Sequence, residues 1–478
     1  MPLPPARRAP CPWRPSRRPS KPSWPPSSAT SGRGPNAPPT GASAQAGTAA
    51  TADPAGGEPG PGGPGVIHTD VLDCGARLVT EAMADVRSAS VGVWVGTGSR
   101  DEDDLRSGAS HFLEHLLFKG TPTWKAAEIA EAVDEVGGDM NAFTTKEYTA
   151  FYVRLLSRDL PLGLDVLGAI MTDPALDPAD VHAERQVILD EILMHADEPA
   201  DLASEQCTGA LFPGHPLGRE VLGIKDSVSA LDDAEIRRFF DHHYRTANMV
   251  VAAAGDVDHD RLAAEIDRRF ASRSGGGSPD RTSPDRPPRT RVITTRATEQ
   301  AHLVVGMRTP GRHAEERWAL SLLNHALGGG MSSRLFQEVR ERRGLAYAVW
   351  SERTHYDEIG VLSVGVGTAP QHTRTVLGLV DEELDRLGDV GITARELAVA
   401  KGHLRAETLL SLEDSGARMS RVGSSLLLHG RVMDADELID HIEAVTLEDV
   451  AGVAAKLAAE PRTVSVVGPF SSDDFPER

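Results

Sequence analysis

The alternation of hydrophobic and polar residues divides the first half of the chain into strands and helices. Residues that alternate predict strands, and apolar residues that recur every three or four positions predict amphipathic helices. We expect strands within residues 66–79, 88–95, 141–145, 148–155 and 249–254. We expect helices over residues 109–118, 123–136, 160–171, 178–196 and 234–244.

The second half repeats this order of elements. Its patterns predict strands at residues 301–307, 346–352, 361–366 and 463–467, and helices at 315–327, 333–342, 373–387 and 394–413. Each half ends in an apolar strand that finishes in glycine, at Gly255 and at Gly468. The sequence therefore predicts two domains of mixed helices and strands, related by a weak internal duplication.

Two segments of biased composition set the expected domain boundaries. Residues 272–290 are rich in Gly, Ser, Pro, Arg and Asp and predict a linker, which leaves an N-terminal domain at 66–271 and a C-terminal domain at 291–475. Residues 1–65 are rich in Pro, Ala, Ser and Arg and predict a disordered tail. No apolar segment follows its arginines, so we expect a basic tail or an over-extended reading frame rather than a secretory signal.

Composition and charge exclude several classes of function. No apolar run reaches the 18 or so residues of a membrane span, so no membrane partner is expected. The net charge is −20, and the first 52 residues carry seven basic residues and no acid, so the rest of the chain is more acidic still. Such a surface is unsuited to nucleic acid. The three cysteines lack CxxC spacing, which argues against a disulfide framework and is compatible with the cytoplasm.

The segment His111-Phe-Leu-Glu-His115 carries the clearest chemistry. On a helix, His111 and His115 are four apart and project from one face, where two neutral imidazoles can bind one divalent metal, most plausibly zinc. Glu114 points towards the same face and can act as the general base in metal-assisted hydrolysis. This order of residues is the inverzincin motif. A single histidine among leucines is usually a packed core residue, but burying three such groups without a shared partner is costly.

A third ligand is expected on the helix at residues 178–196. Glu184 and Glu191 are seven residues apart and therefore lie on one helical face, two turns from each other. Such a pair is more often simply solvated charge. Spacing alone does not choose between Glu184, Asp190 and Glu191 as the ligand.

Several separated motifs, in a consistent order, resemble one known family. They are His111–Thr121 (HFLEHLLFKGT), Gly138–Thr144 (GDMNAFT), Glu184–Ile188 (ERQVI), Gly328–Phe336 (GGGMSSRLF) and Arg343–Tyr347 (RGLAY). Together they resemble the M16 (pitrilysin/insulinase) metallopeptidases, in particular the branch of the mitochondrial processing peptidase beta subunit and its bacterial relatives. The resemblance runs from about residue 66 to residue 470. It implies an α+β fold of two similar domains, each a mostly antiparallel sheet packed with helices.

The resemblance also implies roles for individual residues. The family's third zinc ligand, about 76 residues beyond the second histidine, corresponds to Glu191, and Glu184 corresponds to a glutamate that supports the site without ligating. Arg340 and Tyr347 match an arginine and a tyrosine of the second domain that reach the substrate, Arg340 to hold a peptide carbonyl and Tyr347 to stabilise the oxyanion. The residues expected to bind substrate as an added strand are Asn141, Ala142, Phe143 and Thr144.

The expected function is therefore that of a zinc endopeptidase acting on peptides or short unfolded protein segments. Family members enclose substrate in a chamber of four such domains, and this chain has two, so it should pair with another chain. Because it carries both the metal motif and the Arg340–Tyr347 pair, a homodimer is the economical expectation, with a heterodimer as the alternative. The rival function is a non-catalytic core or assembly subunit of the same fold.

Overall fold

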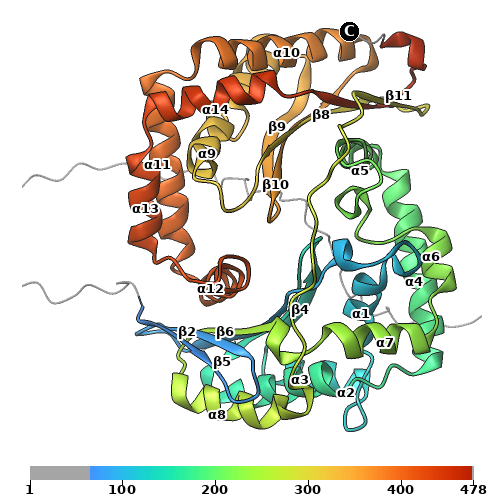
Figure 1. Cartoon of the computed structure of the whole chain (residues 1–478), viewed down its shortest axis with the longest axis vertical. Helices are drawn as coiled ribbons and strands as arrows, with labels where there is room; N and C mark the ends of the chain where they lie inside the picture. The colour runs from blue at the N-terminus through green and yellow to red at the C-terminus, as the bar shows by residue number, and fades with distance from the viewer. Residues whose placement is uncertain (1–64, 476–478) are drawn as a thin grey trace, which may run out of the picture. The chain divides into compact units, whose positions relative to one another are not determined.

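The structure, a computed structural model, describes residues 65–475 and contains two β-sheets with helices packed on them (Figure 1). The first sheet has the strand order β1-β2-β6-β3-β5-β4, and all its neighbours are antiparallel except β2 and β6. Its strands are β1 (Ile67–Val71), β2 (Arg77–Ala82), β3 (Ser88–Val95), β4 (Asp139–Thr144), β5 (Thr149–Leu156) and β6 (Met249–Gly255). The predicted tail lies outside the described residues, apart from Gly65.

The second sheet repeats the arrangement of the first. Its strand order is β7-β11-β8-β10-β9, again antiparallel except for one pair, β7 and β11. Its strands are β7 (Arg291–Thr295), β8 (Ala301–Pro310), β9 (Ala346–His355), β10 (Ile359–Thr368) and β11 (Thr463–Gly468). Taken in chain order, these five strands follow the same path as β2 to β6. The predicted α+β fold of two similar, mostly antiparallel domains is confirmed.

Fourteen α-helices cover the two sheets within residues 65–475. Those of the first half are α1 (Ala109–Leu117), α2 (Ala126–Glu135), α3 (Leu160–Thr172), α4 (Pro178–Asp197), α5 (Pro199–Leu211), α6 (Lys225–Ala230), α7 (Asp233–His243) and α8 (His259–Phe270). Those of the second half are α9 (Glu316–Leu327), α10 (Thr373–Val390), α11 (Ala394–Ser411), α12 (Ser415–His429), α13 (Ala435–Ala444) and α14 (Leu447–Ala459). The helix predicted at 333–342 is wound as a π-helix over Phe336–Arg342.

Each half contributes one helix to the sheet of the other half. Helix α5 packs Cys207 and Leu211 against Val304 of β8 and Val467 of β11. Helix α12 packs against β2, β3 and β6 in a separate cluster around Trp94. This exchange places each of the two helices on a sheet that is distant from it in sequence (Figure 1). The domain limits predicted at residues 271 and 291 remain predictions, although residues 274–290 contain no helix or strand.

A buried ion pair fixes α12 to the first sheet. The carboxylate of Glu81, on β2, accepts a hydrogen bond from Arg418 at 2.5 Å and one from Arg421 at 2.8 Å. The side chains of Glu81 and Arg418 are almost completely buried. Because a buried charge requires a paired partner, this contact specifies where α12 lies on the sheet.

A second buried ion cluster joins the two halves through Glu147, in the turn between β4 and β5. The Glu147 carboxylate accepts hydrogen bonds from Arg100 at 2.5 Å and from Arg312 of the second half. Arg100 also binds Glu358, at 2.5 Å, and Arg281 donates to the Glu147 carbonyl at 2.5 Å. Burial disfavours the charged form, but the arginines outweigh it and hold the pKa of Glu147 below its ordinary value.

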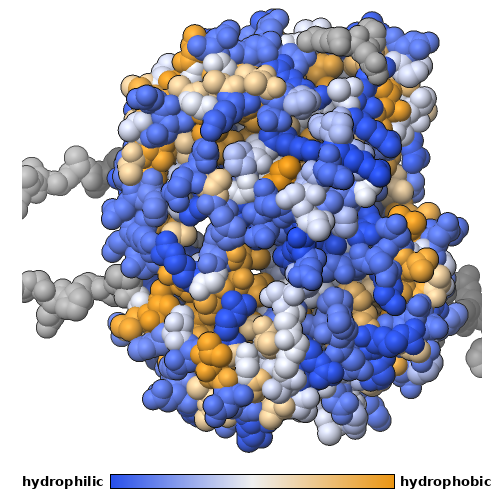
Figure 2. Space-filling view, in the orientation of Figure 1, coloured by the Kyte–Doolittle hydropathy of each residue, from blue (hydrophilic) through white to orange (hydrophobic). Residues whose placement is uncertain are grey.

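The visible surface is mostly hydrophilic (Figure 2). Hydrophobic residues show on this face chiefly where α12 meets the first sheet, at the lower left of the view. Among residues 65–475, no helix combines the length and the apolar character that crossing a membrane requires.

Replacing Glu147 with alanine should lower the free energy of unfolding by about 3–5 kcal/mol, because Arg100 and Arg312 would stay buried without their carboxylate. Urea-induced unfolding followed by circular dichroism measures the change. The matched control is Glu338→Ala, which removes a carboxylate paired with the exposed Arg342 and should cost less than about 1 kcal/mol. Equal decreases in the free energy of unfolding of the two variants would contradict the proposed contribution of the Glu147 cluster to stability.

Candidate metal centre

The helix that carries the histidine motif, α1, begins at a position that its surroundings determine. Its N-cap is Gly108, whose φ of +97° is a left-handed conformation, and a Cβ there would lie 2.7 Å from the Leu222 carbonyl oxygen. The buried Glu102 carboxylate accepts hydrogen bonds from the N–H groups of Gly108 and Ser110, both at 2.7 Å. Burial raises the pKa of Glu102 to about 8, although these N–H donors oppose the shift. Two N–H groups at the helix start are therefore satisfied inside the protein.

The two histidines of α1 meet Glu191 of α4. The Nε2 atoms of His111 and His115 lie 3.6 and 3.7 Å from Oε2 of Glu191, and the ligand atoms of the three residues are all within 4.8 Å of one another. Two ligand atoms bound tetrahedrally to zinc, each at 2.0–2.1 Å, are about 3.4 Å apart. The observed separations are therefore close to those that a shared metal ion needs.

The contacts and burial of both imidazoles suit metal binding. Nδ1 of His115 lies 3.1 Å from Oε2 of Glu184, so a proton on Nδ1 leaves the lone pair on Nε2. This Nε2 atom is buried and has no hydrogen-bond partner among the described residues. Burial, with the nearby His115 and His195, holds the pKa of His111 well below its ordinary value, so His111 is neutral. Both side chains can thus offer a nitrogen lone pair to a cation.

Glu184 supports the site from a neighbouring position on α4. Its Oε2 atom faces His115, and its Oε1 atom pairs with Lys119 at 2.5 Å. Burial disfavours the charged carboxylate, but the hydrogen bonds from His115 and Lys119 outweigh it and lower the pKa of Glu184. A charged Glu184 orients the His115 ring, as carboxylates beside metal-binding histidines do.

Glu114 lies on the same helix and is almost fully buried. Its Oε2 atom accepts a hydrogen bond from the Thr144 hydroxyl at 2.7 Å. Burial raises the pKa of Glu114, and this hydrogen bond opposes the rise. A buried carboxylate with a raised pKa, next to a possible metal site, has the properties of a general base.

The donor set fits a catalytic metal site. Two imidazole nitrogens and one carboxylate are the protein ligands of several catalytic zinc sites, which keep the fourth position open. Of the three acids that spacing left open, Glu191 lies beside both histidines and Glu184 binds His115. Asp190 is exposed and lies outside the group.

The expected substrate strand is β4, which forms an edge of the first sheet. Among the strands of residues 65–475 it pairs only with β5, so its other edge has no neighbouring strand there. Along β4 the side chains alternate: Ala142 and Thr144 are buried on the side of α1, and Phe143 packs with Tyr148 and Tyr152 on the opposite face. An extended peptide paired with β4 would therefore run beside the helix of the motif.

Arg340 and Tyr347 lie together in the second half. The Arg340 guanidinium stacks on the rings of Phe336 and Tyr347, 4.6 and 4.7 Å from their centroids, and donates a hydrogen bond to the Tyr347 carbonyl at 3.1 Å. Tyr347 is 80% exposed. Within the described part of the chain, no hydrogen bond or ion pair links either residue to the histidines or to Glu191.

Sequence reasoning missed three contacts that position the site. They are the Glu102 cap of α1, the Lys119–Glu184 pair and the hydrogen bond from Thr144 to Glu114. Lys119 lies four residues after His115, and this spacing could have suggested that both contact one acid. The other two contacts depend on loops and strands that the motif itself does not describe.

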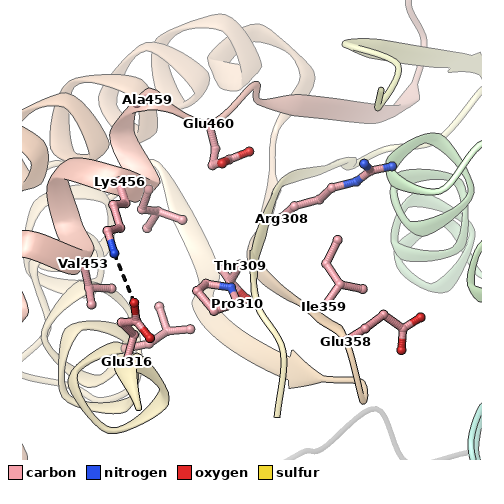
Figure 3. Close-up of a pocket in the computed structure, with 12 residues that line it drawn as sticks. Arg308, Thr309, Pro310, Glu316, Glu358, Ile359, Val453, Lys456, Ala459 and Glu460 are labelled. Atoms are coloured by element: carbon pink, nitrogen blue, oxygen red, sulfur yellow. Dashed lines mark hydrogen bonds and ion pairs between the residues drawn. The ribbon is translucent and has the colours of Figure 1, made fainter. Parts of the chain in front are cut away.

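A separate pocket of about 570 Å³ lies in the second half (Figure 3). Several of the charged residues at its walls are already bound elsewhere: Lys456 binds Glu316 at 3.1 Å, and Arg308 turns away to the Leu211 carbonyl of α5. None of the motif residues lines it. The group of residues that could hold a metal ion lies elsewhere, where α1 meets α4.

Comparison with known proteins identifies the family of the chain. Residues 77–225 match the model of the insulinase family (peptidase family M16), and residues 230–404 match the model of the peptidase M16 inactive domain. A Streptomyces coelicolor protein named as an uncharacterized zinc protease is 44% identical over 418 residues, which cover 85% of this chain and 91% of the relative. A Mycobacterium tuberculosis protein with the same description is 46% identical over 405 residues, covering 83% and 92%.

A solved structure shares the fold. The crystal structure of a peptidase M16 inactive domain from Pseudomonas fluorescens superimposes with a TM-score of 0.79 at 21% identity, over 85% of this chain and 98% of that one. Sequence models, relatives and fold agree over most of the chain. The protein therefore belongs to the insulinase family, peptidase family M16.

Proposed function

We propose that this protein is a zinc-dependent endopeptidase that hydrolyses peptides or short unfolded protein segments. The observation that carries the proposal is the convergence of His111, His115 and Glu191 beside the buried Glu114. The relatives' names, which describe zinc proteases, support a peptidase activity and the choice of zinc.

His111, His115 and Glu191 would hold the zinc ion, and Glu184 would orient His115. When bound, zinc supplies a Lewis acid. Glu114 is the group of this chain that moves the proton. It accepts a proton from the attacking water as the water oxygen bonds to the scissile carbonyl carbon, and it donates that proton to the leaving amine as the carbon–nitrogen bond breaks.

The edge strand β4 would bind the substrate through main-chain hydrogen bonds. Such pairing requires an extended chain and tolerates many sequences, which favours peptides and unfolded segments over folded proteins. From the second half, Arg340 would hold a substrate carbonyl and the exposed Tyr347 would stabilise the oxyanion.

The chamber would be formed by two copies of this chain, acting in the cytoplasm. A single chain supplies two domains, and it carries both the metal-site residues and Arg340 with Tyr347. The described cysteines, Cys74 and Cys207, are buried and free, which suits a reducing compartment. The alternative, a non-catalytic subunit, would not require the full set of metal-site and base residues that the chain retains.

Replacing Glu114 with glutamine should reduce kcat for a quenched basic peptide by about 10²–10⁴-fold, because the amide cannot accept the proton from water. Zinc content, measured by atomic absorption, should be unchanged, since Glu114 is not one of the three grouped ligands. The matched control is Glu131→Gln on the exposed face of α2, which should cleave like the wild type.

Three results would contradict the proposal. Undiminished cleavage by the Glu114→Gln protein would show that Glu114 is not the general base. Cleavage that continues after a chelator has removed all zinc would show that the reaction does not need the metal. A wild-type protein that holds no zinc and cleaves no member of a broad peptide panel would favour the non-catalytic subunit.

Replacing Glu184 with glutamine should weaken zinc binding by about 10–100-fold, because the orienting carboxylate next to His115 becomes neutral. Competition with a chromogenic chelator measures this affinity. Asp190→Asn, a like change at an exposed position of the same helix, should leave the affinity at the wild-type value. If Asp190→Asn weakens binding and Glu184→Gln does not, the assignment of the supporting carboxylate is wrong.

Purified protein should sediment as a species of twice the chain mass, as expected for a chamber built from two copies. Sedimentation equilibrium over a range of concentrations tests this. A monomer that cleaves peptides with full activity would contradict the two-chain chamber.

A further inference from the structure

We propose that Thr144 is a positioning residue that holds the carboxylate of Glu114 in the orientation needed for proton transfer. This inference rests on the proposed function, because it assigns Thr144 a role through the general base. It goes beyond the expected role of the strand, in which Thr144 contributes only to substrate pairing.

The contact is short and enclosed. The Thr144 hydroxyl donates to Oε2 of Glu114 at 2.7 Å, and both side chains are buried. One oxygen of the Glu114 carboxylate is therefore fixed by the protein, through the side chain of Thr144. A group that transfers protons must be held within about 0.5 Å of its productive position.

Thr144 itself is held on both sides. It is the last residue of β4 and pairs with Thr149 of β5. The turn that follows is bound by hydrogen bonds from Ser99 N–H to the Thr145 carbonyl at 3.1 Å and from Arg100 N–H to the Lys146 carbonyl at 2.9 Å. A residue larger than glycine at position 98 would collide with this turn.

The turn is also anchored by the buried Glu147 cluster. Glu147 lies three residues after Thr144 and binds Arg100 of the first half and Arg312 of the second. The backbone N–H of Asp357 donates to the same carboxylate at 3.1 Å. The end of β4 is thereby attached to both halves of the chain, so the hydroxyl of Thr144 has little freedom to move away from Glu114.

This arrangement links substrate docking to the base. The open edge of β4 is the place where an extended peptide would pair, and the last residue of that strand holds Glu114. A peptide paired with β4 and the carboxylate that serves its hydrolysis would then share one rigid element. Small displacements between reacting groups can cost about 10²-fold in rate, so such sharing has a direct effect on kcat.

A neighbouring threonine, Thr149, provides a control that distinguishes a positioning role of Thr144 from general structural support. Thr149 lies opposite Thr144 in the strand pair, is buried, and donates its hydroxyl to the Thr97 carbonyl at 3.0 Å. Removing either hydroxyl deletes one buried hydrogen bond made by a residue of the first sheet. Only the Thr144 hydroxyl contacts a group proposed to take part in the reaction.

The test compares Thr144→Val, Thr144→Ser and Thr149→Val in the full-length, zinc-loaded protein, using the quenched peptide. Thr144→Val should reduce kcat by about 10–100-fold with KM within about twofold of wild type, because the base is misplaced while peptide pairing is retained. Thr144→Ser, which restores the hydroxyl, should recover kcat to within about threefold. Thr149→Val should lower the melting temperature with kcat unchanged, and zinc content should be stoichiometric in every variant.

Several outcomes would overturn the inference. They are a wild-type kcat in Thr144→Val, an equal loss of kcat in Thr149→Val, a change confined to KM, failure of Thr144→Ser to restore kcat, or loss of zinc in Thr144→Val. These results are distinct from failure of the proposed function. If the wild type cleaves and Glu114→Gln does not, an unaffected Thr144→Val removes only the role of Thr144. If the wild type fails to cleave, the proposed function and this inference fall together.

Discussion

The convergence of two imidazoles and a carboxylate where α1 meets α4 is the constraint on which the rest of the structure depends. Groups of this kind are costly to bury unless they share a partner, and a divalent cation satisfies all three at once. The surroundings hold this group in place: Glu102 fixes the start of α1, and Glu184 contacts the His115 ring. The geometry of the proposed metal site is therefore a property of how the two helices pack, beyond the motif itself.

Each half of the chain packs one of its helices on the sheet of the other half, and this exchange of helices connects the two halves. Helices α5 and α12 each complete the core of the other half's sheet, and the Glu147 cluster joins both halves to the turn after β4. Because the same turn follows the strand that contacts Glu114, the interface between the halves is connected to the position of the proposed base. In the proposed mechanism, this connection gives the second half an indirect influence on Glu114.

Much of the fold and part of the site could be predicted from the sequence, for identifiable reasons. The two histidines and Glu114 lie within one helical turn, so local geometry alone places them together. The duplicated order of strands follows from alternating patterns that repeat in each half. The choice of Glu191 rather than Asp190 as the third ligand required the family resemblance. Which residues of α4 face the histidines depends on how α4 packs against α1, and spacing in the sequence does not reveal that packing.

Other features depend on contacts that a pattern does not contain. Helical periodicity can indicate an apolar face on α5 or α12, but not that the face belongs on the other half's sheet. The contact of Thr144 with Glu114 likewise joins a strand to a helix through tertiary packing. The most direct test of the account is a crystal structure with anomalous diffraction recorded at the zinc absorption edge. The account predicts one strong peak about 2.0–2.2 Å from His111, His115 and Glu191, and a peak bound elsewhere, or none in zinc-loaded crystals, would contradict it.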